Sequence, residues 1–140
     1  MPTRSASATW KGGLKTGNGS YAIPNGLSGP YTFASRFENE AGSNPEELLA
    51  AAHAACYSMA LSAELEKNGT PGTSVRTNAK VTLESKDGKP TITTIQLEVE
   101  AKVAKIDDAA FQKIAAATKD GCPVSRALKA VDIKLSAKLA

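Results

Sequence analysis

The sequence has few of the residue types that bind metals, with two cysteines and one histidine among 140 residues. A structural zinc site normally takes four cysteine or histidine ligands. The three candidates here are His53, Cys56 and Cys122, and no C-x-x-C pair occurs. We therefore expect no bound metal ion.

Long apolar runs and clustered charges are also missing. Residues 1–12 hold no apolar stretch typical of a secretory leader, and no apolar run approaches the roughly 20 residues of a membrane span. We therefore expect a cytoplasmic protein with no membrane partner. The 17 basic and 14 acidic residues alternate along the chain, with a net charge of +3. Because a nucleic-acid site gathers its basic residues on one face or arm, we expect no nucleic-acid partner.

No glycine- or proline-rich linker and no internal repeat divides the chain. A length of 140 residues is typical of one domain and is enough for one hydrophobic core. We therefore expect residues 1–140 to form a single domain.

The first third of the chain has the patterns of short strands. Apolar and polar residues alternate over Ala6–Trp10, which predicts a strand. Glycine and asparagine turn signals follow. We expect two further strands, over Tyr21–Ile23 and Tyr31–Phe37.

A long helix is predicted from Pro45 to Lys67. Asn44 can cap its start, proline suits the first helical position, and Glu47 completes the pattern of a capping box. Asn68 and Gly69 are a typical helix end. The middle of the helix is largely alanine and apolar on most faces, so we expect it to be buried on several sides, at the centre of the fold and between two subunits.

The remainder predicts two long strands joined at Asp87-Gly88, a helix over residues 107–119, a short helix from Pro123 and a final strand over residues 131–139. Strands and helices are partly segregated along the chain. The fold class is therefore expected to be α+β, with a mostly antiparallel sheet and a long central buried helix.

The two cysteines have different local environments. Cys56 lies inside the apolar helix, where burial raises a thiol pKa and makes the sulfur inert. Cys122, in Gly121-Cys122-Pro123, falls at the N-cap of the short helix, where a thiolate is stabilised. The residues alone leave two interpretations open: unrelated buried thiols, which are the commoner case, or a pair that meets for redox chemistry.

Two blocks of the sequence resemble one known family. The segment Ser43-Asn44-Pro45-Glu46-Glu47-Leu48-Leu49-Ala50-Ala51-Ala52-His53-Ala54-Ala55-Cys56-Tyr57-Ser58-Met59-Ala60 resembles the signature of the OsmC/Ohr family, the osmotically inducible protein C and organic hydroperoxide resistance proteins. The segment Gly121-Cys122-Pro123-Val124-Ser125 is similar to the family's second cysteine motif. The order of elements also fits over the whole chain. The resemblance implies an intertwined homodimer that reduces organic hydroperoxides in preference to hydrogen peroxide.

The resemblance also implies roles for four residues. Cys56 matches the peroxidatic cysteine, Cys122 the resolving cysteine and Glu46 the active-site glutamate, while Arg36 resembles the arginine of the OsmC branch. Arg36 would stabilise the Cys56 thiolate, and Glu46 would hold the guanidinium by a bidentate pair. Glu46 and Cys56 are ten residues apart, about 15 Å along a straight helix. Either the helix is irregular near Glu46, or the site forms across the dimer.

The implied cycle passes through a Cys56 sulfenic acid and a Cys56–Cys122 disulfide, which an external dithiol reduces, so no cofactor is expected. Two alternatives stay open: a non-catalytic redox sensor or binding protein, and a protein with a structural disulfide. His53 is on the same helix face as Cys56 and is a candidate base. We favour a histidine held by a backbone carbonyl.

Overall fold

The structure is a computed structural model that describes residues 2–140. The chain forms two compact units, one up to Leu48 and one over Leu49–Ala140, and each is described by itself. The expectation that residues 1–140 act as a single domain stays a prediction.

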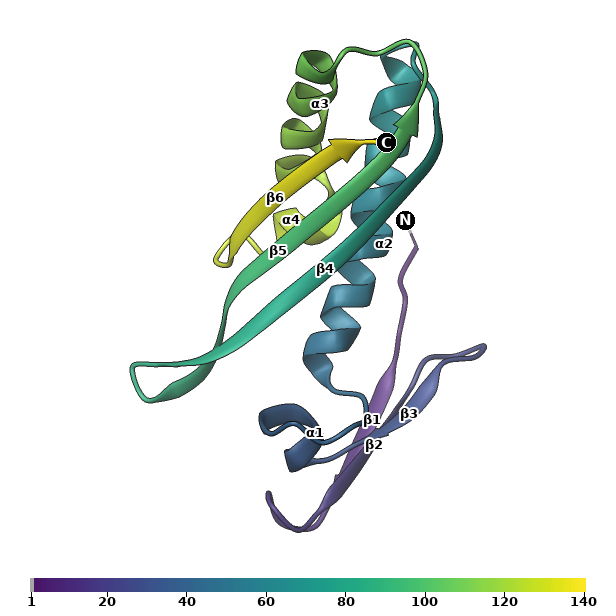
Figure 1. Cartoon of the computed structure of the whole chain (residues 1–140). Helices are drawn as coiled ribbons and strands as arrows, with labels where there is room; N and C mark the ends of the chain where they lie inside the picture. The colour runs from purple at the N-terminus through teal and green to yellow at the C-terminus, as the bar shows by residue number, and fades with distance from the viewer. Residues whose placement is uncertain (1) are drawn as a thin grey trace. The chain divides into compact units, whose positions relative to one another are not determined.

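The first unit contains a small antiparallel sheet, in the order β1-β2-β3 (Figure 1). Its strands are β1 (Ser7–Lys11), β2 (Asn18–Ala22) and β3 (Ser28–Tyr31). A Cβ atom at Gly19 would lie 2.6 Å from the Tyr31 ring and 2.7 Å from Trp10. Only glycine therefore lets these aromatic side chains pack over the middle strand. Strand β1 lies one residue after the predicted range Ala6–Trp10, whereas β2 begins three residues before the predicted Tyr21–Ile23 and shares only Tyr21 and Ala22 with it.

The expected strand over Tyr31–Phe37 is wrong, because most of this segment is helix α1 (Phe33–Phe37). The Thr32 side chain accepts a hydrogen bond from the Ser35 N–H, and the Ser35 side chain accepts one from the Thr32 N–H. This capping box satisfies two backbone donors at the helix start. Local capping therefore overrides the strand preference of the aromatic residues.

Helix α2 (Pro45–Lys67) has the bounds that the sequence predicted. Asn44 Oδ1 accepts from the Glu47 N–H at 2.8 Å, which caps the start. At the end, Gly69 has φ 79° and the Thr70 N–H donates to the Leu65 carbonyl at 3.0 Å. The helix is unbroken, so no irregularity occurs near Glu46.

The second unit contains a three-stranded sheet in the order β4-β5-β6. The strands are β4 (Gly72–Lys86), β5 (Lys89–Val103) and β6 (Asp132–Leu139). Strands β4 and β5 pair antiparallel and turn through Asp87 and Gly88, which both have positive φ, at 52° and 74°. Strand β6 pairs parallel with β5, so the sheet is mixed.

Two further helices connect β5 to β6 in this unit. They are α3 (Asp108–Gly121) and α4 (Pro123–Ala127). Asp107 caps α3 by accepting from the Ala110 N–H at 2.7 Å. Because β6 runs parallel to β5, the chain needs a crossover of this length to return to the same end of the sheet.

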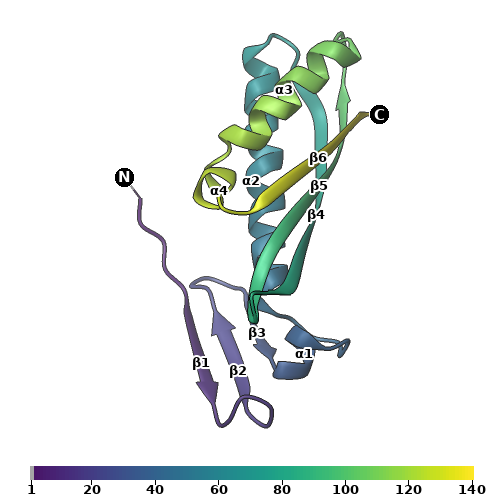
Figure 2. The same cartoon turned by 90° about the vertical axis from the view of Figure 1, so that its left-hand side faces the viewer.

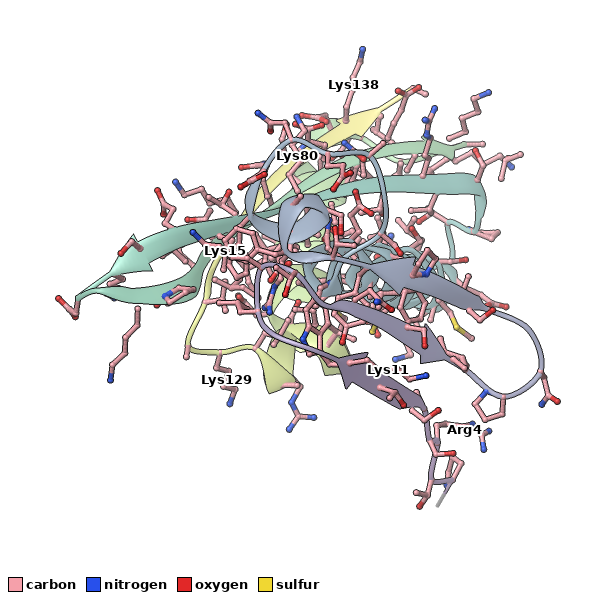
Figure 3. The ribbon with its side chains drawn as sticks, turned by 90° about the horizontal axis from the view of Figure 1, so that it is seen from below. Arg4, Lys11, Lys15, Lys80, Lys129 and Lys138 are labelled. Carbon is pink, nitrogen blue, oxygen red and sulfur yellow. The ribbon has the colours of Figure 1, made fainter. Side chains whose placement is uncertain are left out.

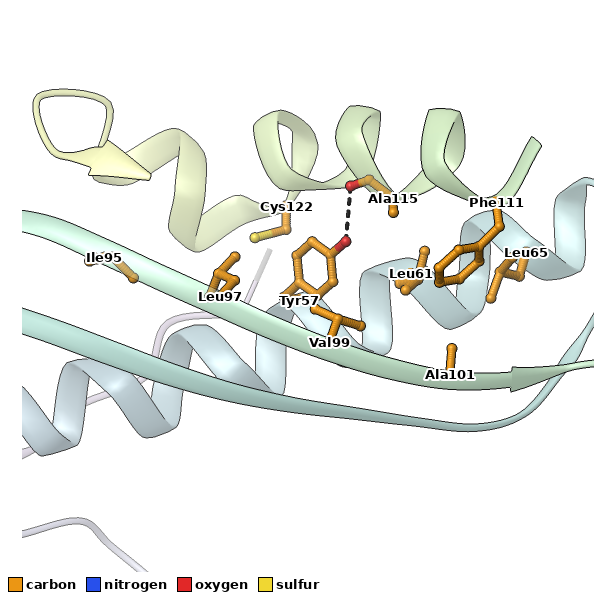
Figure 4. Close-up of a cluster of buried hydrophobic side chains, with 10 residues drawn as sticks. All are labelled: Tyr57, Leu61, Leu65, Ile95, Leu97, Val99, Ala101, Phe111, Ala115 and Cys122. Carbon is orange, nitrogen blue, oxygen red and sulfur yellow. Dashed lines mark hydrogen bonds between the residues drawn. The ribbon is translucent and has the colours of Figure 1, made fainter. Parts of the chain in front are cut away.

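The core of the second unit lies between the sheet and the helices α2 and α3, which cover one face of the sheet (Figures 2 and 4). Its buried members are Tyr57, Leu61, Leu65, Ile95, Leu97, Val99, Ala101, Phe111, Ala115 and Cys122. The three from α2 are spaced four residues apart, which is the period of one helix face. The four from β5 alternate along the strand, which places them on one face of the sheet.

Helix α2 is buried on one face only within this chain, which differs from the expected burial on several sides. Ala51, Ala52, Ala55 and Ala63 are exposed, and Met59 is 79% exposed. The helix is apolar nearly all round, but one sheet and one helix cover only a single face of it. An exposed alanine face therefore runs along this side of the helix.

One helix in the described part of the chain, α2, is long and apolar enough to cross a membrane by length and composition alone. The expectation that no segment approaches a membrane span is therefore not met by α2. The core helix of a soluble protein passes the same test, and 22% of the apolar 18-residue window of α2 is buried within this chain.

The opposite face of the β4-β5-β6 sheet is polar. Lys80 of β4 pairs with Glu98 of β5 at 2.7 Å. Lys80 and Lys138 project from β4 and β6, while Lys129 projects from the segment after α4 (Figure 3). Basic side chains on this unit are thus spread over several elements and are interleaved with acidic ones.

Candidate active site

Cys122 lies at the junction of two helices. Its N–H donates to the Thr118 carbonyl at the end of α3, and its side chain caps α4, as the sequence predicted. The sulfur accepts from the Ser125 N–H at 3.4 Å and donates to Ser125 Oγ at 3.1 Å. The residue is 1% exposed. This thiol is therefore held in place by hydrogen bonds and shielded from solvent.

Cys56, in the middle of α2, lies beside Cys122. Its sulfur is within hydrogen-bonding reach of the Cys122 thiol and of the Val124 backbone. Both cysteines are free, and Cys56 is half-buried whereas Cys122 is buried. The fold thus brings the two thiols together, and the interpretation of two unrelated thiols is wrong.

The environment of Cys56 disfavours its thiolate. Burial is the largest cause and raises the pKa of the Cys56 thiol. The backbone hydrogen bond to Val124 lowers the pKa, and the neighbouring Cys122 raises it. A thiol in this setting needs a nearby cation to become nucleophilic at neutral pH.

Arg36 and Glu46 form a bidentate ion pair within the first unit. Arg36 Nε donates to Glu46 Oε1 at 3.1 Å and to Oε2 at 3.3 Å, and its Nη2 donates to Oε1 at 2.9 Å. The Glu46 side chain is 9% exposed and that of Arg36 is 35% exposed. The predicted pairing is therefore confirmed, and the carboxylate fixes a guanidinium that still reaches solvent.

His53 has a different partner from the backbone carbonyl that the sequence suggested. Its Nε2 lies 2.7 Å from Ser125 Oγ. The residue is fully buried, and burial lowers the pKa of the His53 imidazole. Ser125 was given no role in the sequence prediction. Its position, three residues after the N-cap Cys122, is the signal that places its side chain beside the sulfur.

Tyr57 is a second residue without a predicted polar contact. Its hydroxyl donates to the Ala115 carbonyl of α3 at 2.9 Å, and the side chain is fully buried (Figure 4). Burial, and secondarily Cys122, raises the pKa of the Tyr57 phenol, which stays neutral. This hydrogen bond ties α2 to α3 next to the thiols.

A largely apolar groove of about 680 Å³ opens between α2 and α3 and reaches Cys122 and Pro123. Four of its lining residues are alanines, Ala60 and Ala63 on α2 and Ala110 and Ala117 on α3. Small side chains leave this space open beside the cysteine. A ligand of this size with an apolar body fits such a groove.

Over residues 2–140, no group of three or more histidine, cysteine, aspartate or glutamate side chains is placed to hold a metal ion. Paired cysteines can pass between dithiol and disulfide without any other redox group.

Comparisons of sequence relate the chain to known proteins. The family model described as OsmC-like protein matches residues 37–136. This range contains Glu46, Cys56 and Cys122, and Arg36 lies one position before it. The Peroxiredoxin OsmC of Escherichia coli (strain K12) is 46% identical over 129 residues, which cover 91% of this chain and 90% of that protein. The Peroxiredoxin OsmC of Shigella flexneri matches to the same extent.

Comparisons of structure agree with the fold. The organic hydroperoxide resistance protein OhrB of Bacillus subtilis superposes with a TM-score of 0.75 at 27% identity, over 96% of this chain and 98% of that one. An organic hydroperoxide resistance protein from Elizabethkingia anophelis gives a TM-score of 0.78 at 22% identity, over 99% of both chains, a likeness of fold. The α+β class with a long helix is therefore confirmed.

Proposed function

The chain belongs to the OsmC-like protein family and is a thiol peroxidase, and from this premise we propose that it reduces organic hydroperoxides through a Cys56 sulfenic acid and a Cys56–Cys122 disulfide. The observation that carries the proposal is the contact between the two thiols, one half-buried and one buried. The half-buried thiol of Cys56 is the one a peroxide reaches first. The buried thiol can then attack only its neighbour.

The first chemical step belongs to Cys56. Its thiolate attacks the distal oxygen of the hydroperoxide, the O–O bond breaks, and the alkoxide takes a proton and leaves as an alcohol. The sulfur is oxidised to a sulfenic acid. Burial opposes the thiolate here, so this step requires a cation near the sulfur.

We assign that cation to Arg36, held by Glu46. The ion pair leaves the guanidinium 35% exposed and oriented by a carboxylate, which suits it to face a thiolate and a peroxide oxygen. Because ten residues of unbroken helix rise about 15 Å, we place the Arg36–Glu46 pair of the partner subunit against Cys56. The active site then forms only in the homodimer.

The homodimer itself is supported by the exposed face of α2. Alanines and Met59 along this face remain uncovered within one chain. A second copy of the same helix can approach closely, because alanine side chains are small. Burial of this apolar face would stabilise the dimer.

The remaining steps return the enzyme to its dithiol form. Cys122 attacks the sulfenic sulfur of Cys56, the S–O bond breaks, and a disulfide and water form. An external dithiol then reduces the disulfide by two exchange reactions. Such reductants are kept reduced in the cytoplasm, where we place the protein.

The substrate preference follows from the groove between α2 and α3. Its volume of about 680 Å³ and its alanine walls suit an alkyl or aryl group. Hydrogen peroxide has no apolar group to bury there. We therefore propose that organic hydroperoxides are reduced faster than hydrogen peroxide. Relatives named organic hydroperoxide resistance proteins support this preference.

The test is turnover of tert-butyl hydroperoxide with dithiothreitol or dihydrolipoamide. We expect many equivalents to be consumed by the wild type and none above background by Cys56→Ser. The Cys122→Ser variant should stop at a sulfenic acid or turn over slowly. Ser58→Ala, which removes a hydroxyl elsewhere on α2, is the matched control. A folded wild type that oxidises once without turnover would instead be a redox sensor.

A further inference from the structure

A chain of hydrogen bonds leads away from Cys122 to a buried histidine. The Cys122 thiol donates to Ser125 Oγ at 3.1 Å, and Ser125 Oγ lies 2.7 Å from His53 Nε2. The three residues come from α2, from the α3–α4 junction and from α4. Two hydrogen bonds thus join the resolving sulfur to the only histidine of the sequence.

All three groups are shielded from water. The exposed fractions are 0% for His53, 1% for Cys122 and 3% for Ser125. Water therefore has little access to the Cys122 proton. When this thiol attacks, its proton needs a protein group to receive it, and the hydroxyl of Ser125 is the group in contact.

His53 is buried with one polar atom unpaired. Among the side chains of residues 2–140, His53 Nδ1 is a buried atom with no hydrogen-bond partner. Leaving a buried donor or acceptor without a partner destabilises the fold. An apolar side chain would fill the same place without this cost. The buried imidazole does make a polar contact through its other nitrogen, Nε2, with Ser125 Oγ.

We propose that His53, acting through the Ser125 hydroxyl, accepts the Cys122 proton during disulfide formation and returns it to the hydroxide that leaves Cys56. The inference deepens the proposed function and rests on it. Ser125 touches the reacting sulfur and is the catalytic residue of this relay. His53 acts through Ser125 and is a positioning residue.

The step balances without an outside reactant. The Cys122 S–H bond breaks, its proton passes to Ser125 Oγ, and the Ser125 proton passes to His53 Nε2. The S–S bond then forms as the S–O bond of the Cys56 sulfenic acid breaks. His53 gives the proton back through Ser125 to the hydroxide, which leaves as water. The Cys56 sulfur is reduced and the Cys122 sulfur is oxidised.

Burial of the imidazole suits this transient role. The lowered pKa of His53 keeps it neutral, and so able to accept, at neutral pH. The same shift makes the imidazolium release its proton readily. General acid–base groups of this kind typically contribute about 10²–10⁴-fold to the rate of a step.

The test separates the two oxidation steps by rapid mixing with tert-butyl hydroperoxide. Formation of the Cys56 sulfenic acid and formation of the disulfide are followed as separate phases in wild type, His53→Gln and Ser125→Ala. We expect disulfide formation to slow by roughly 100-fold in both variants, within the usual range for a general base. Sulfenic acid formation should change little, which also reports that the variants are folded.

Two further variants sharpen the result. Ser125→Thr keeps a hydroxyl beside the sulfur and should recover most of the disulfide rate. Ser58 lies on the same helix as His53, and its hydroxyl donates to Thr77 of β4 at 2.7 Å. Ser58→Ala removes this hydrogen bond and should leave both phases as in wild type. Loss of a purely structural hydrogen bond would slow both phases together and would not be rescued by threonine.

Three outcomes would overturn the relay. Wild-type rates of disulfide formation in His53→Gln and Ser125→Ala contradict it while leaving the proposed function intact. Equal slowing of both phases assigns the network a structural role. A wild type that forms neither sulfenic acid nor disulfide would overturn the proposed function instead, and the relay with it.

Discussion

Cys56 lies on an alanine-rich helix, and its partial burial disfavours ionisation of the thiol. A neighbouring group must therefore stabilise the thiolate. Burial raises the pKa of the Cys56 thiol, and the single backbone hydrogen bond opposes this only in part. A guanidinium close to the sulfur favours the thiolate and offsets the desolvation. The proposed reaction therefore requires the Arg36 guanidinium, which Glu46 holds in position.

Replacement of Arg36 by alanine should move the pH dependence of Cys56 oxidation. The thiolate is the attacking form, so its rate rises with pH until the thiol is ionised. Without the cation the thiol pKa is higher, and the rate curve shifts to higher pH. We expect roughly a tenfold loss at pH 7, since one pKa unit is a factor of ten.

The measurement is the rate of sulfenic acid formation from pH 6 to pH 10. Arg76→Ala, which removes an exposed arginine from β4, is the control and should leave the curve in place. An Arg36→Ala curve that overlays the wild type would contradict the role assigned to Arg36.

His53 should make stability depend on pH. Its pKa in the folded protein is lowered by burial, so the unfolded chain binds the proton first as pH falls. Stability is then fully present above the unfolded pKa, near 6.5, and is lost below it. Urea unfolding at pH 7 and pH 5 should show a larger loss for wild type than for His53→Gln. Equal losses would mean that His53 does not titrate on unfolding.

The residues of the site differ in how far the sequence predicts them. Cys56, Cys122, Arg36 and Glu46 occur in motifs, and their two pairings are observed. The contact between His53 and Ser125 joins residues far apart in the chain. It depends on where α4 packs against α2, which no local pattern specifies. A buried polar partner of this kind becomes predictable only once the fold is known.

Among the secondary-structure elements, nearby residues determine where a helix begins and ends, but they do not determine which of its faces is buried. The start of α2 at Pro45, its end at Lys67 and the Asp107 cap follow from residues within one turn of each end. The aromatic residues after Tyr31 favour a strand in sequence, whereas the Thr32 capping box makes this segment a helix. The burial of α2 could not be predicted for one chain, because alanine suits a core and an interface equally.

The cap of α3 should contribute measurably to stability, since this helix holds Cys122 at its end. Asp107→Ala removes the acceptor of the 2.7 Å bond from Ala110 N–H. We expect the free energy of unfolding to fall by about 1 kcal/mol. Asp107→Ser retains an acceptor and should lose much less. Chemical denaturation measures both, and equal losses would show that the cap bond does not stabilise α3.

Narrowing the groove should discriminate between substrates. Ala117 lines the groove from α3 and is exposed, so Ala117→Leu fills space without removing a core contact. We expect KM for cumene hydroperoxide to rise several-fold and that for hydrogen peroxide to stay constant. Steady-state kinetics with both peroxides measures this. A parallel change for both would mean that the groove does not hold the substrate.

For the whole molecule, the exposed face of α2 predicts a homodimer. Met59 is 79% exposed within one chain and would be covered by the second copy. Met59→Glu places a charge in the proposed interface and should give a monomer with little peroxidase activity, because the proposed site takes residues from both subunits. Sedimentation velocity measures the mass, with Lys129→Glu, on a separate exposed segment, as the control. A dimeric and fully active Met59→Glu protein would contradict this interface.

The order of the two cysteines is the central claim, and chemical trapping tests it most directly. Cys122→Ser is treated with one equivalent of tert-butyl hydroperoxide and then with dimedone, and the labelled peptide is identified by mass spectrometry. The account predicts the label on Cys56, because the half-buried thiol meets the peroxide and has lost its resolving partner. Absence of label on Cys56, together with labelled Cys122 in the Cys56→Ser protein, would contradict it.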